Sequence, residues 1–265
     1  DLRFGFTLPP SGSILLTIEG KAEPKEFQNV SLEDCLPVRG MVSECANIVP
    51  LPGEFEFERV DPNVLVMDRI SVSFDGGKTF EKEDLDHRVR RVLAKRFDTE
   101  AALDWQPWVS IRKKLFEGKG GEIVLRYRFE SDIEKPKAYV VIEDIGKGAL
   151  TVNGASVDTS NAGWIWDHGF GKVEITDLVK KGGNVIDFKV DYDFLTEVEA
   201  AYIVGDFGVK MADPFRGKIV DEPKTLKVGS WTTQGYPFYS GRMVYKTTFR
   251  AEEGRKTVLR LVNPS

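Results

Sequence analysis

"GALTVNGASVD", the stretch Gly148–Asp158, contains the most informative turn in the chain. A short apolar segment, Ala149–Val152, runs into Asn153-Gly154, and a second extended segment follows. Asn-Gly is the strongest short-range hairpin signal, because both central residues of a type I′ turn need a positive φ. The stretch therefore predicts a tight β-hairpin.

The composition is that of a globular chain. The 265 residues are 41% hydrophobic and 30% charged, with a net charge of −5, which allows one large or two modest domains. The acidic balance argues against a nucleic-acid partner, which needs a basic surface. No apolar run reaches the roughly 18 residues of a membrane span, so we expect no membrane partner.

Short β segments separated by turn residues account for most of the chain. In residues 121–130, GEIVLRYRFE, apolar side chains alternate with polar ones, which predicts a sheet buried on one face, as in a sandwich. We therefore expect an all-β fold. The predicted strands, besides the hairpin, are 13–18, 54–59, 63–67, 70–74, 122–129, 138–143, 173–175, 184–190, 242–249 and 257–262.

A helical insertion interrupts these strands. Residues 82–97, KEDLDHRVRRVLAKRF, space Leu85, Val89, Val92, Leu93 and Phe97 at helical intervals, which predicts a surface helix across a sheet edge or end. Its basic residues fit a solvated helix face better than a nucleic-acid patch in a chain of acidic total charge. A second helical piece is expected over residues 108–118, ending at Gly118.

The segments that follow the hairpin carry a family resemblance. After LTVNGASVD come the loop TSNAGWIWDHGFG (159–171) and KVEITDLVKKGGNVIDFKV (172–190), with the pattern ITxLxxxGxN before a strand. This order resembles the accessory jelly-roll β-sandwich, the galactose-binding-like sugar-binding domain, of bacterial glycoside hydrolases of family 2 and of large α-L-rhamnosidase-like enzymes. In that family the VNG hairpin and the corner before the second strand form adjacent strands, and a Gly-Asn corner after a short helical turn lets the chain switch sheets.

The resemblance extends to the flanking segments. Residues 196–210 and 226–250 look like the stretch that links two such sandwiches, and residues 4–20 look like the end of a preceding β domain. We therefore expect a fragment of a longer polypeptide with three parts. These are residues 1–60 (end of a β domain and an irregular linker), 61–212 (the jelly-roll sandwich) and 213–265 (a connector, at 212–224, and a truncated second β-sandwich).

The resemblance implies a non-catalytic carbohydrate-binding or scaffold module of a larger glycoside hydrolase, with hydrolysis in a domain outside this chain. It also implies an extracellular or periplasmic location. Two alternatives remain, a purely structural interdomain module without a ligand and a hydrolase whose site lies within these residues. No catalytic residue is assigned in this chain, and the expected partners are a glycan and other domains of the same polypeptide.

One loop has the composition of a sugar contact. In GWIWDHGF, residues 163–170, Trp164 and Trp166 can stack on apolar sugar faces while Asp167 and His168 take hydroxyl groups. The alternative is that one or both indoles plug the open end of the sandwich. The same ambiguity holds for further aromatic groups, which are Trp105 with Trp108, and Trp231 with Tyr236 and Tyr239, the last three being expected as an interdomain plug.

Acids and cysteines give weaker signals. Glu197, Glu199 and Asp206 are close in sequence, and we expect solvent-exposed or interface acids rather than a catalytic pair. No cofactor is predicted, although loop acids could hold a structural calcium ion, and the candidates are Asp144, Asp191 and Asp193. Cys35 and Cys45 could form a disulfide or remain two free thiols. With two histidines and two cysteines, no zinc-site spacing occurs.

Residues 71–80, SVSFDGGKTF, match the Asp-box pattern of sialidase propellers. In that motif the Asp side chain caps a hairpin turn and the aromatic residue packs beneath it. A propeller needs several copies at a fixed period, and this chain has one. The motif therefore predicts a structural turn rather than a catalytic site.

Overall fold

The computed structural model of the chain describes residues 53–248. Two compact units divide the chain, and the larger one, residues 61–223 with 231–241, is called the two-sheet unit below. The smaller unit includes a three-stranded antiparallel sheet in which β1 (Glu54–Arg59) lies between β15 (Leu226–Lys227) and β16 (Met243–Lys246). The predicted strands 13–18 and 257–262, with Cys35 and Cys45, lie outside the described residues.

One sheet of the two-sheet unit has five strands in the order β2-β12-β6-β10-β9. All of its neighbouring strands are antiparallel. The strands are β2 (Asn63–Met67), β12 (Ala201–Gly205), β6 (Ala138–Glu143), β10 (Asp167–Glu174) and β9 (Gly163–Ile165).

The other sheet has eight strands, six of them in the order β13-β14-β5-β11-β7-β8. Strand β3 pairs with β5 and with β4, and β14 runs parallel to β5, whereas the remaining pairs are antiparallel. The strands are β3 (Arg69–Ser73), β4 (Asp84–Leu85), β5 (Gly120–Ser131), β7 (Gly148–Val152), β8 (Ala155–Val157), β11 (Gly182–Asp193), β13 (Gly208–Asp213) and β14 (Arg216–Val220).

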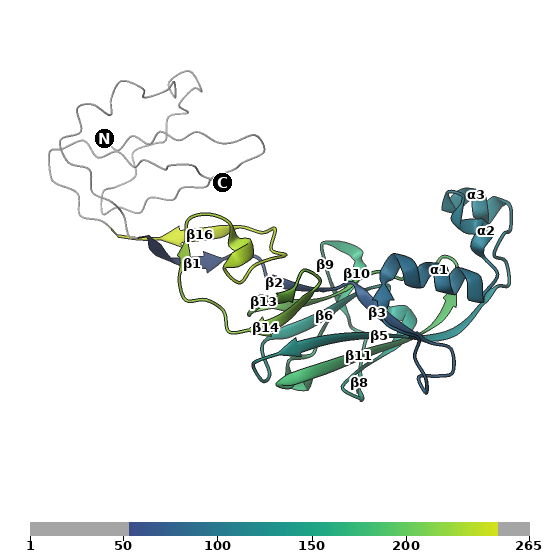
Figure 1. Ribbon diagram of the computed structural model, residues 1–265, viewed down its shortest axis with the longest axis horizontal. Coiled ribbons are helices and arrows are strands. Elements are labelled where there is room, and N and C mark those ends of the chain that lie inside the picture. The colour runs from purple at the N-terminus through teal and green to yellow at the C-terminus, as the bar shows by residue number, and fades with distance from the viewer. Residues whose placement is uncertain (1–52, 249–265) are drawn as a thin grey trace, which may run out of the picture. The chain divides into compact units, whose positions relative to one another are not determined.

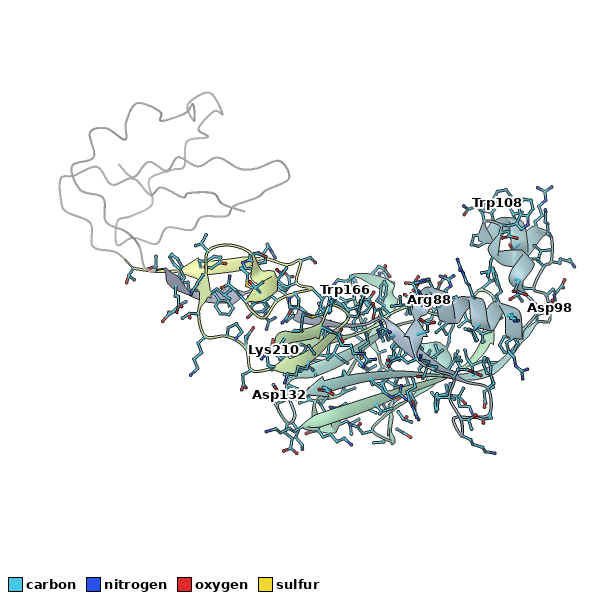
Figure 2. The ribbon with its side chains drawn as sticks, in the orientation of Figure 1. Arg88, Asp98, Trp108, Asp132, Trp166 and Lys210 are labelled. Atoms are coloured by element: carbon cyan, nitrogen blue, oxygen red, sulfur yellow. The ribbon has the colours of Figure 1, made fainter. Side chains whose placement is uncertain are left out.

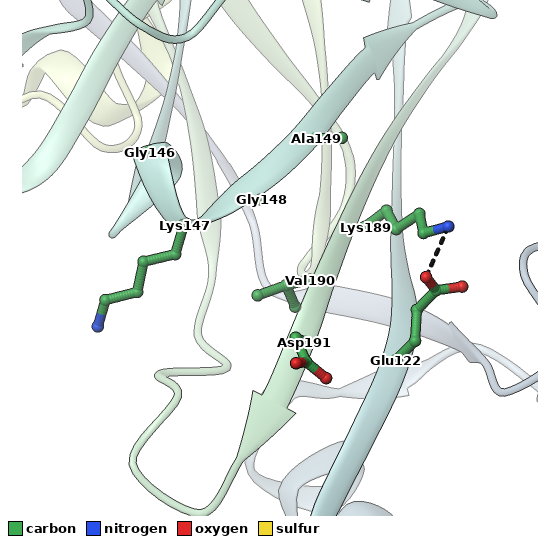
Figure 3. Close-up of a pocket in the computed structure, with 8 residues that line it drawn as sticks. All are labelled: Glu122, Gly146, Lys147, Gly148, Ala149, Lys189, Val190 and Asp191. Atoms are coloured by element: carbon green, nitrogen blue, oxygen red, sulfur yellow. Dashed lines mark ion pairs between the residues drawn. The ribbon is translucent and has the colours of Figure 1, made fainter.

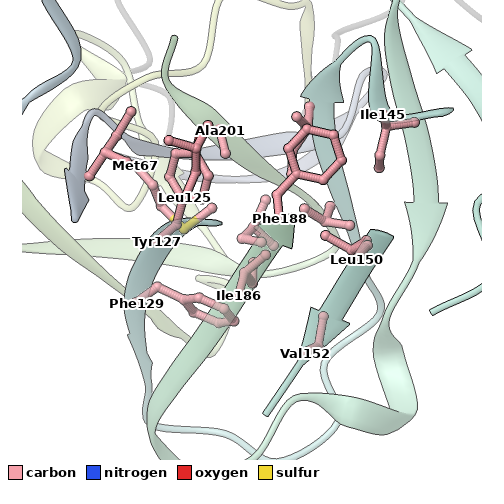
Figure 4. Close-up of a cluster of buried hydrophobic side chains, with 14 of the residues drawn as sticks. Met67, Leu125, Tyr127, Phe129, Ile145, Leu150, Val152, Ile186, Phe188 and Ala201 are labelled. Carbon is pink, nitrogen blue, oxygen red and sulfur yellow. The ribbon is translucent and has the colours of Figure 1, made fainter. Parts of the chain in front are cut away.

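The two sheets share one hydrophobic core. Leu125, Ile186 and Phe188 of the eight-stranded sheet (Figure 4) belong to the same buried cluster as Val140 and Ile203 of the five-stranded sheet. The alternation predicted for residues 121–130 is confirmed, since the four apolar side chains of one face are buried. Removal of this apolar surface from water is the main force that holds the two sheets together.

The Asn-Gly hairpin is confirmed, with Asn153 at φ 52° and Gly154 at φ 83° between β7 and β8. Strand β7 pairs with β11, as expected from the sequence order. Between β10 and β11 the chain makes a short 3₁₀ turn, Thr176–Leu178, and passes from the five-stranded to the eight-stranded sheet. Gly182, at φ 91°, begins β11 after this corner.

The helical insertion is shorter and more broken than predicted. It contains α1 (Asp86–Arg96), α2 (Glu100–Leu103) and α3 (Pro107–Arg112), grouped at one end of the two-sheet unit (Figure 1). Val92 belongs to the predicted apolar spacing but is 43% exposed, because the buried face of α1 is formed by Val89, Leu93 and Ala94. The helix expected to end at Gly118 ends at Arg112, since Lys114 takes a left-handed conformation at φ 56°.

The turn predicted from the Asp-box motif is present and is held by hydrogen bonds to Asp75. The Asp75 Oδ1 atom accepts hydrogen bonds from the amides of Lys78 (3.0 Å) and Thr79 (2.9 Å), and Asp75 Oδ2 accepts one from the Thr79 hydroxyl (2.6 Å). These bonds hold the pKa of Asp75 well below its usual range. The Phe80 ring lies against the Arg126 guanidinium, 3.7 Å from its carbon to the ring centroid.

Strand β14 forms within residues 212–224, a segment that the sequence suggested was a connector. Its sequence, RGKIV, has only two apolar residues. It forms a hairpin with the preceding β13 and pairs over a long sequence distance with β5. A strand of this kind gives no clear periodic signal in a single sequence.

Candidate functional site

The four residues expected to contact sugar lie on one short hairpin. Trp164 is in β9, Asp167 and His168 are in β10, and Trp166 forms the turn between them, with Ile165 opposite Asp167. The register shifts between Asp167 and Gly171, so this part of β10 bulges. Trp166 has φ 68°, which for a bulky side chain is a strained conformation costing about 1–2 kcal/mol.

Trp166 belongs to a group of three aromatic rings. Its ring meets Phe170 with a centroid separation of 5.7 Å and Tyr202 with one of 5.1 Å, and Phe170 and Tyr202 are 6.0 Å apart, all in edge-to-face arrangements. Phe170 of β10 is paired with Glu143 of β6. Tyr202 of β12 is paired with Val141, which lies two residues before Glu143 in β6. The rings of β10 and β12 therefore share one face of the five-stranded sheet.

Trp164 makes a separate pair with His168, whose ring centroid is 4.3 Å away. The two indoles remain about half exposed, Trp164 at 54% and Trp166 at 51%. Neither of them is a buried plug. The aromatic platform is defined here as these two groups together, namely Trp164, Trp166, His168, Phe170 and Tyr202.

Asp167 has a structural role in the same hairpin. Its Oδ1 atom accepts a hydrogen bond of 2.7 Å from the amide of Gly169, inside the bulge. A side chain at Gly169 would lie 3.1 Å from this Asp167 oxygen and 3.5 Å from a Glu143 oxygen. The carboxylates of Asp167 and Glu143 therefore approach each other at this point.

Three glutamates gather beside the platform. Glu143 ends β6, Glu197 and Glu199 precede β12, and each offers an oxygen within 4.8 Å of the other two. This group, Glu143 with Glu197 and Glu199, is called the acidic cluster. Asp206, which is close to these glutamates in sequence, is not part of the cluster. Its carboxylate lies 3.9 Å from the Lys137 Nζ atom, past the opposite end of β12.

The acidic cluster has one cationic neighbour on α1. The Arg90 guanidinium lies 3.7 Å from a Glu197 oxygen and 3.9 Å from a Glu199 oxygen. Partial burial raises the pKa of the Glu143 carboxyl, and the charges of Glu197 and Glu199 raise it further. The backbone of the cluster is fixed from the core, since the buried Tyr127 hydroxyl donates a hydrogen bond of 3.1 Å to the Glu199 carbonyl.

Platform and cluster adjoin. The pKa of Tyr202 is raised first by burial and then by the negative charges of Glu199, Asp86 and Glu143. Two of these three acids belong to the acidic cluster, so Tyr202 of the platform lies close to it. Phe170 and Tyr202 were not identified as site residues from the sequence, although Phe170 lies in the same strand as Asp167 and His168. The signal available was the alternation in β12, where Ala201 and Ile203 are buried and Tyr202 faces the other way.

The acids proposed for calcium do not meet. Among residues 53–248 the acidic cluster is the group of three that could share a metal ion. Asp144 is instead paired with Lys147 Nζ at 2.6 Å, and Asp193 accepts a hydrogen bond from the Leu195 amide. Asp191 lines an open surface pocket of about 470 Å³, where Lys189 and Glu122 form an ion pair of 2.7 Å (Figure 3).

The other aromatic candidates divide into exposed and buried groups. Trp105 and Trp108 are exposed in and beside the short helices, Trp108 at 65%, and Figure 2 shows Trp108 far from Trp166. Lys113 places its Nζ atom 3.4 Å from the Trp105 ring centroid. Tyr236 and Tyr239 are buried within the two-sheet unit, where the Tyr239 ring also contacts Trp231.

In the part of the chain that the structure covers, none of the helices is both long and apolar enough to cross a membrane. Comparison with protein-family models, with curated proteins and with solved structures found no match to this chain.

Proposed function

We propose that the two-sheet unit is a jelly-roll β-sandwich of the galactose-binding type and acts as a non-catalytic carbohydrate-binding module of a larger glycoside hydrolase. The aromatic platform is the observation that carries this proposal. Its two indoles stay about half exposed on one hairpin, and the turn keeps Trp166 in a strained conformation. Strain of this kind is retained where the surrounding structure imposes it and clusters at ligand sites.

The platform suits the chemistry of sugars. A pyranose ring presents C–H groups on its faces and hydroxyl groups at its edges, so aromatic rings with polar neighbours bind it well. Covering the exposed half of one indole removes on the order of 100 Å² of apolar surface from water, which contributes about 2–3 kcal/mol. Two such rings give useful affinity without a deep cavity.

A direct test is the binding of the 265-residue chain to a glycan array, followed by calorimetric titration with the best glycan. We expect Trp166→Ala and Trp164→Ala each to weaken binding by at least about tenfold, from the lost apolar contact. Trp108→Ala is the matched control, because it removes an even more exposed indole at the helical end of the same unit. The Trp108→Ala variant should bind the glycan with the affinity of the unchanged chain.

Thermal unfolding of each variant separates loss of binding from loss of fold. Glycan binding that survives both platform substitutions, or that is lost with Trp108→Ala, would contradict the proposed site. Absence of binding to every glycan on the array would contradict the carbohydrate-binding function itself. Hydrolysis of a nitrophenyl glycoside panel by the purified chain would instead favour a catalytic site within it.

A scaffold function without a ligand is the second candidate. The observation in its favour is the group of exposed apolar side chains around α2 and α3, namely Leu103, Trp105, Trp108 and Ile111. Such side chains could pack against a neighbouring domain of the same polypeptide. The glycan array decides between the two, since a pure scaffold binds no sugar.

A further inference from the structure

Building on the proposed function, we infer that the preferred ligand is a glycan that carries free, protonated amino groups. Oligosaccharides of glucosamine belong to this chemical class. In this arrangement a sugar ring covers Trp166, and the ammonium group of the sugar is bound by Glu143 with the neighbouring Glu197 and Glu199. The positive charge of its amino group thus distinguishes the proposed ligand from neutral glycans.

The position of the acids relative to the rings is the first argument. Phe170 of the platform and Glu143 of the acidic cluster are directly paired residues of β10 and β6. The Trp166 ring contacts both Phe170 and Tyr202, so it lies over the part of the sheet where the strand of Glu143 ends. A ligand ring on Trp166 therefore has carboxylates within reach of its substituents.

The charge that the protein leaves uncompensated is the second argument. Within the described residues, the Glu143 carboxylate receives neither an ion pair nor a hydrogen bond, and Arg90 approaches Glu197 and Glu199 only at 3.7 and 3.9 Å. Asp167 adds further negative charge around Glu143, whereas the charge of the nearby Asp144 is compensated by Lys147 at 2.6 Å. Two cations, Arg90 and Lys147, stand beside five carboxylates, which leaves a negative site. Burial is the first cause of the raised pKa of Glu143, and the charges of Glu197 and Glu199 raise this pKa further.

The surroundings suit an ammonium group better than a metal ion. Calcium takes six to eight oxygen ligands, and a compact divalent ion would have to share the cluster with the Arg90 guanidinium. A sugar ammonium has three donors, which match three carboxylates, and it is attracted to aromatic faces. The rings beside the cluster would contribute nothing to a metal site but provide the apolar contact that a sugar needs.

The test compares two probes of equal length on the 265-residue chain, a glucosamine tetramer and an N-acetylglucosamine tetramer. Acetylation removes the positive charge and leaves the sugar rings in place. By calorimetric titration at low salt and neutral pH, we expect the glucosamine tetramer to bind at least about tenfold more tightly, with an advantage that shrinks as salt rises.

Variants of the chain show which residues cause the preference for the glucosamine tetramer. Glu143→Gln and Glu199→Gln should each reduce the preference for the amine, while binding of the acetylated tetramer changes little. Trp166→Ala should weaken both tetramers together. Asp177→Asn is the control for loss of one negative charge, because Asp177 is exposed and paired with Lys135 at the opposite end of β6. It should leave the preference unchanged.

Failure of this inference is distinct from failure of the proposed function. Equal binding of the two tetramers, or tighter binding of a neutral glycan with the same dependence on Trp166, overturns the amine preference and leaves the carbohydrate-binding function in place. Binding of no glycan overturns both. Calcium binding that is lost with Glu143→Gln, with no amine preference, would show that the acidic cluster is a metal site instead.

Discussion

Asn153 acts through its side chain as much as through its backbone. Its Nδ2 atom donates hydrogen bonds of 2.8 Å to the Leu178 carbonyl and to Asn184 Oδ1, and its Oδ1 atom accepts one of 3.0 Å from the Val185 amide. Asn184 is buried and donates in turn to the carbonyls of Lys180 and Gly182. The turn residue thus joins β7 to the corner that begins β11.

We predict that Asn153→Ala lowers the free energy of unfolding by about 3 kcal/mol. The reason is the loss of three side-chain hydrogen bonds together with the cost of alanine at a positive φ. Asn153→Gly should cost about 1 kcal/mol less, because glycine accepts the backbone conformation but makes none of the bonds. Chemical denaturation of the two variants measures both effects, and an alanine variant as stable as the unchanged chain would contradict this role.

Trp166 shows what a single sequence can indicate about a residue and what it cannot. Its residue type and its neighbours suggested a sugar contact, with a buried plug as the alternative. The exposure of the ring depends on the one-residue turn between β9 and β10 and on support from Tyr202, thirty-six positions away. The neighbours that hold the ring in place follow from strand pairing, which no local pattern specifies.

Helix α1 illustrates the same limit for an element. The periodic apolar residues of 82–97 predicted a helix and the structure contains one, although it spans only Asp86–Arg96. Val92 and Leu93 both belong to the predicted apolar spacing, yet Leu93 is fully buried and Val92 is 43% exposed. Adjacent residues on a helix differ by about 100° in direction, so the exact buried face depends on where the sheet lies.

We predict that Leu93→Ala lowers the free energy of unfolding by about 3 kcal/mol, through lost burial and the cavity left behind. Val92→Ala, on the same helix, should change it by less than about 0.5 kcal/mol, because an exposed valine loses little when truncated. Urea denaturation provides the comparison. Similar losses for the two variants would show that α1 buries a different face.

At the scale of the molecule, the acidic cluster is assembled from distant segments. Glu143 comes from β6, Glu197 and Glu199 from the approach to β12, and Arg90 from α1, while Asp144 and Asp167 add charge nearby. Glu197 and Glu199, which are close in sequence, are also close in space. The addition of Glu143 could not be predicted, because it requires β6 and β12 to be neighbours in the sheet.

The charge of this assembly has a consequence for stability. The raised pKa of Glu143 means that, at neutral pH, its ionised carboxylate is less favourable in the folded chain than in the unfolded one. As pH falls through the raised pKa, the folded chain takes up the proton first and the penalty disappears. We therefore predict that Glu143→Gln is more stable than the unchanged chain at neutral pH.

The stability advantage of Glu143→Gln should shrink as pH falls towards the ordinary pKa of a glutamate. There Glu143 becomes protonated in both the folded and the unfolded chain, so its charge no longer affects stability. Denaturation at a series of pH values measures it, with Asp177→Asn as a control for removal of a carboxylate outside the cluster. A variant less stable than the unchanged chain at neutral pH would contradict the unfavourable burial and repulsion assigned to the Glu143 carboxylate.

The sequence by itself determined the β-rich character, the Asn-Gly hairpin at Asn153, the Asp-box turn and the presence of a helix near residues 82–97. Each of these depends on local chemistry, since φ preferences, side-chain caps and apolar periodicity act over a few residues. Only the tertiary structure decided that Phe170 and Tyr202 support Trp166, and that Glu143 joins Glu197 and Glu199 beside them. Those groupings depend on strand order and register between residues far apart in the chain, which are set by burial of the whole core.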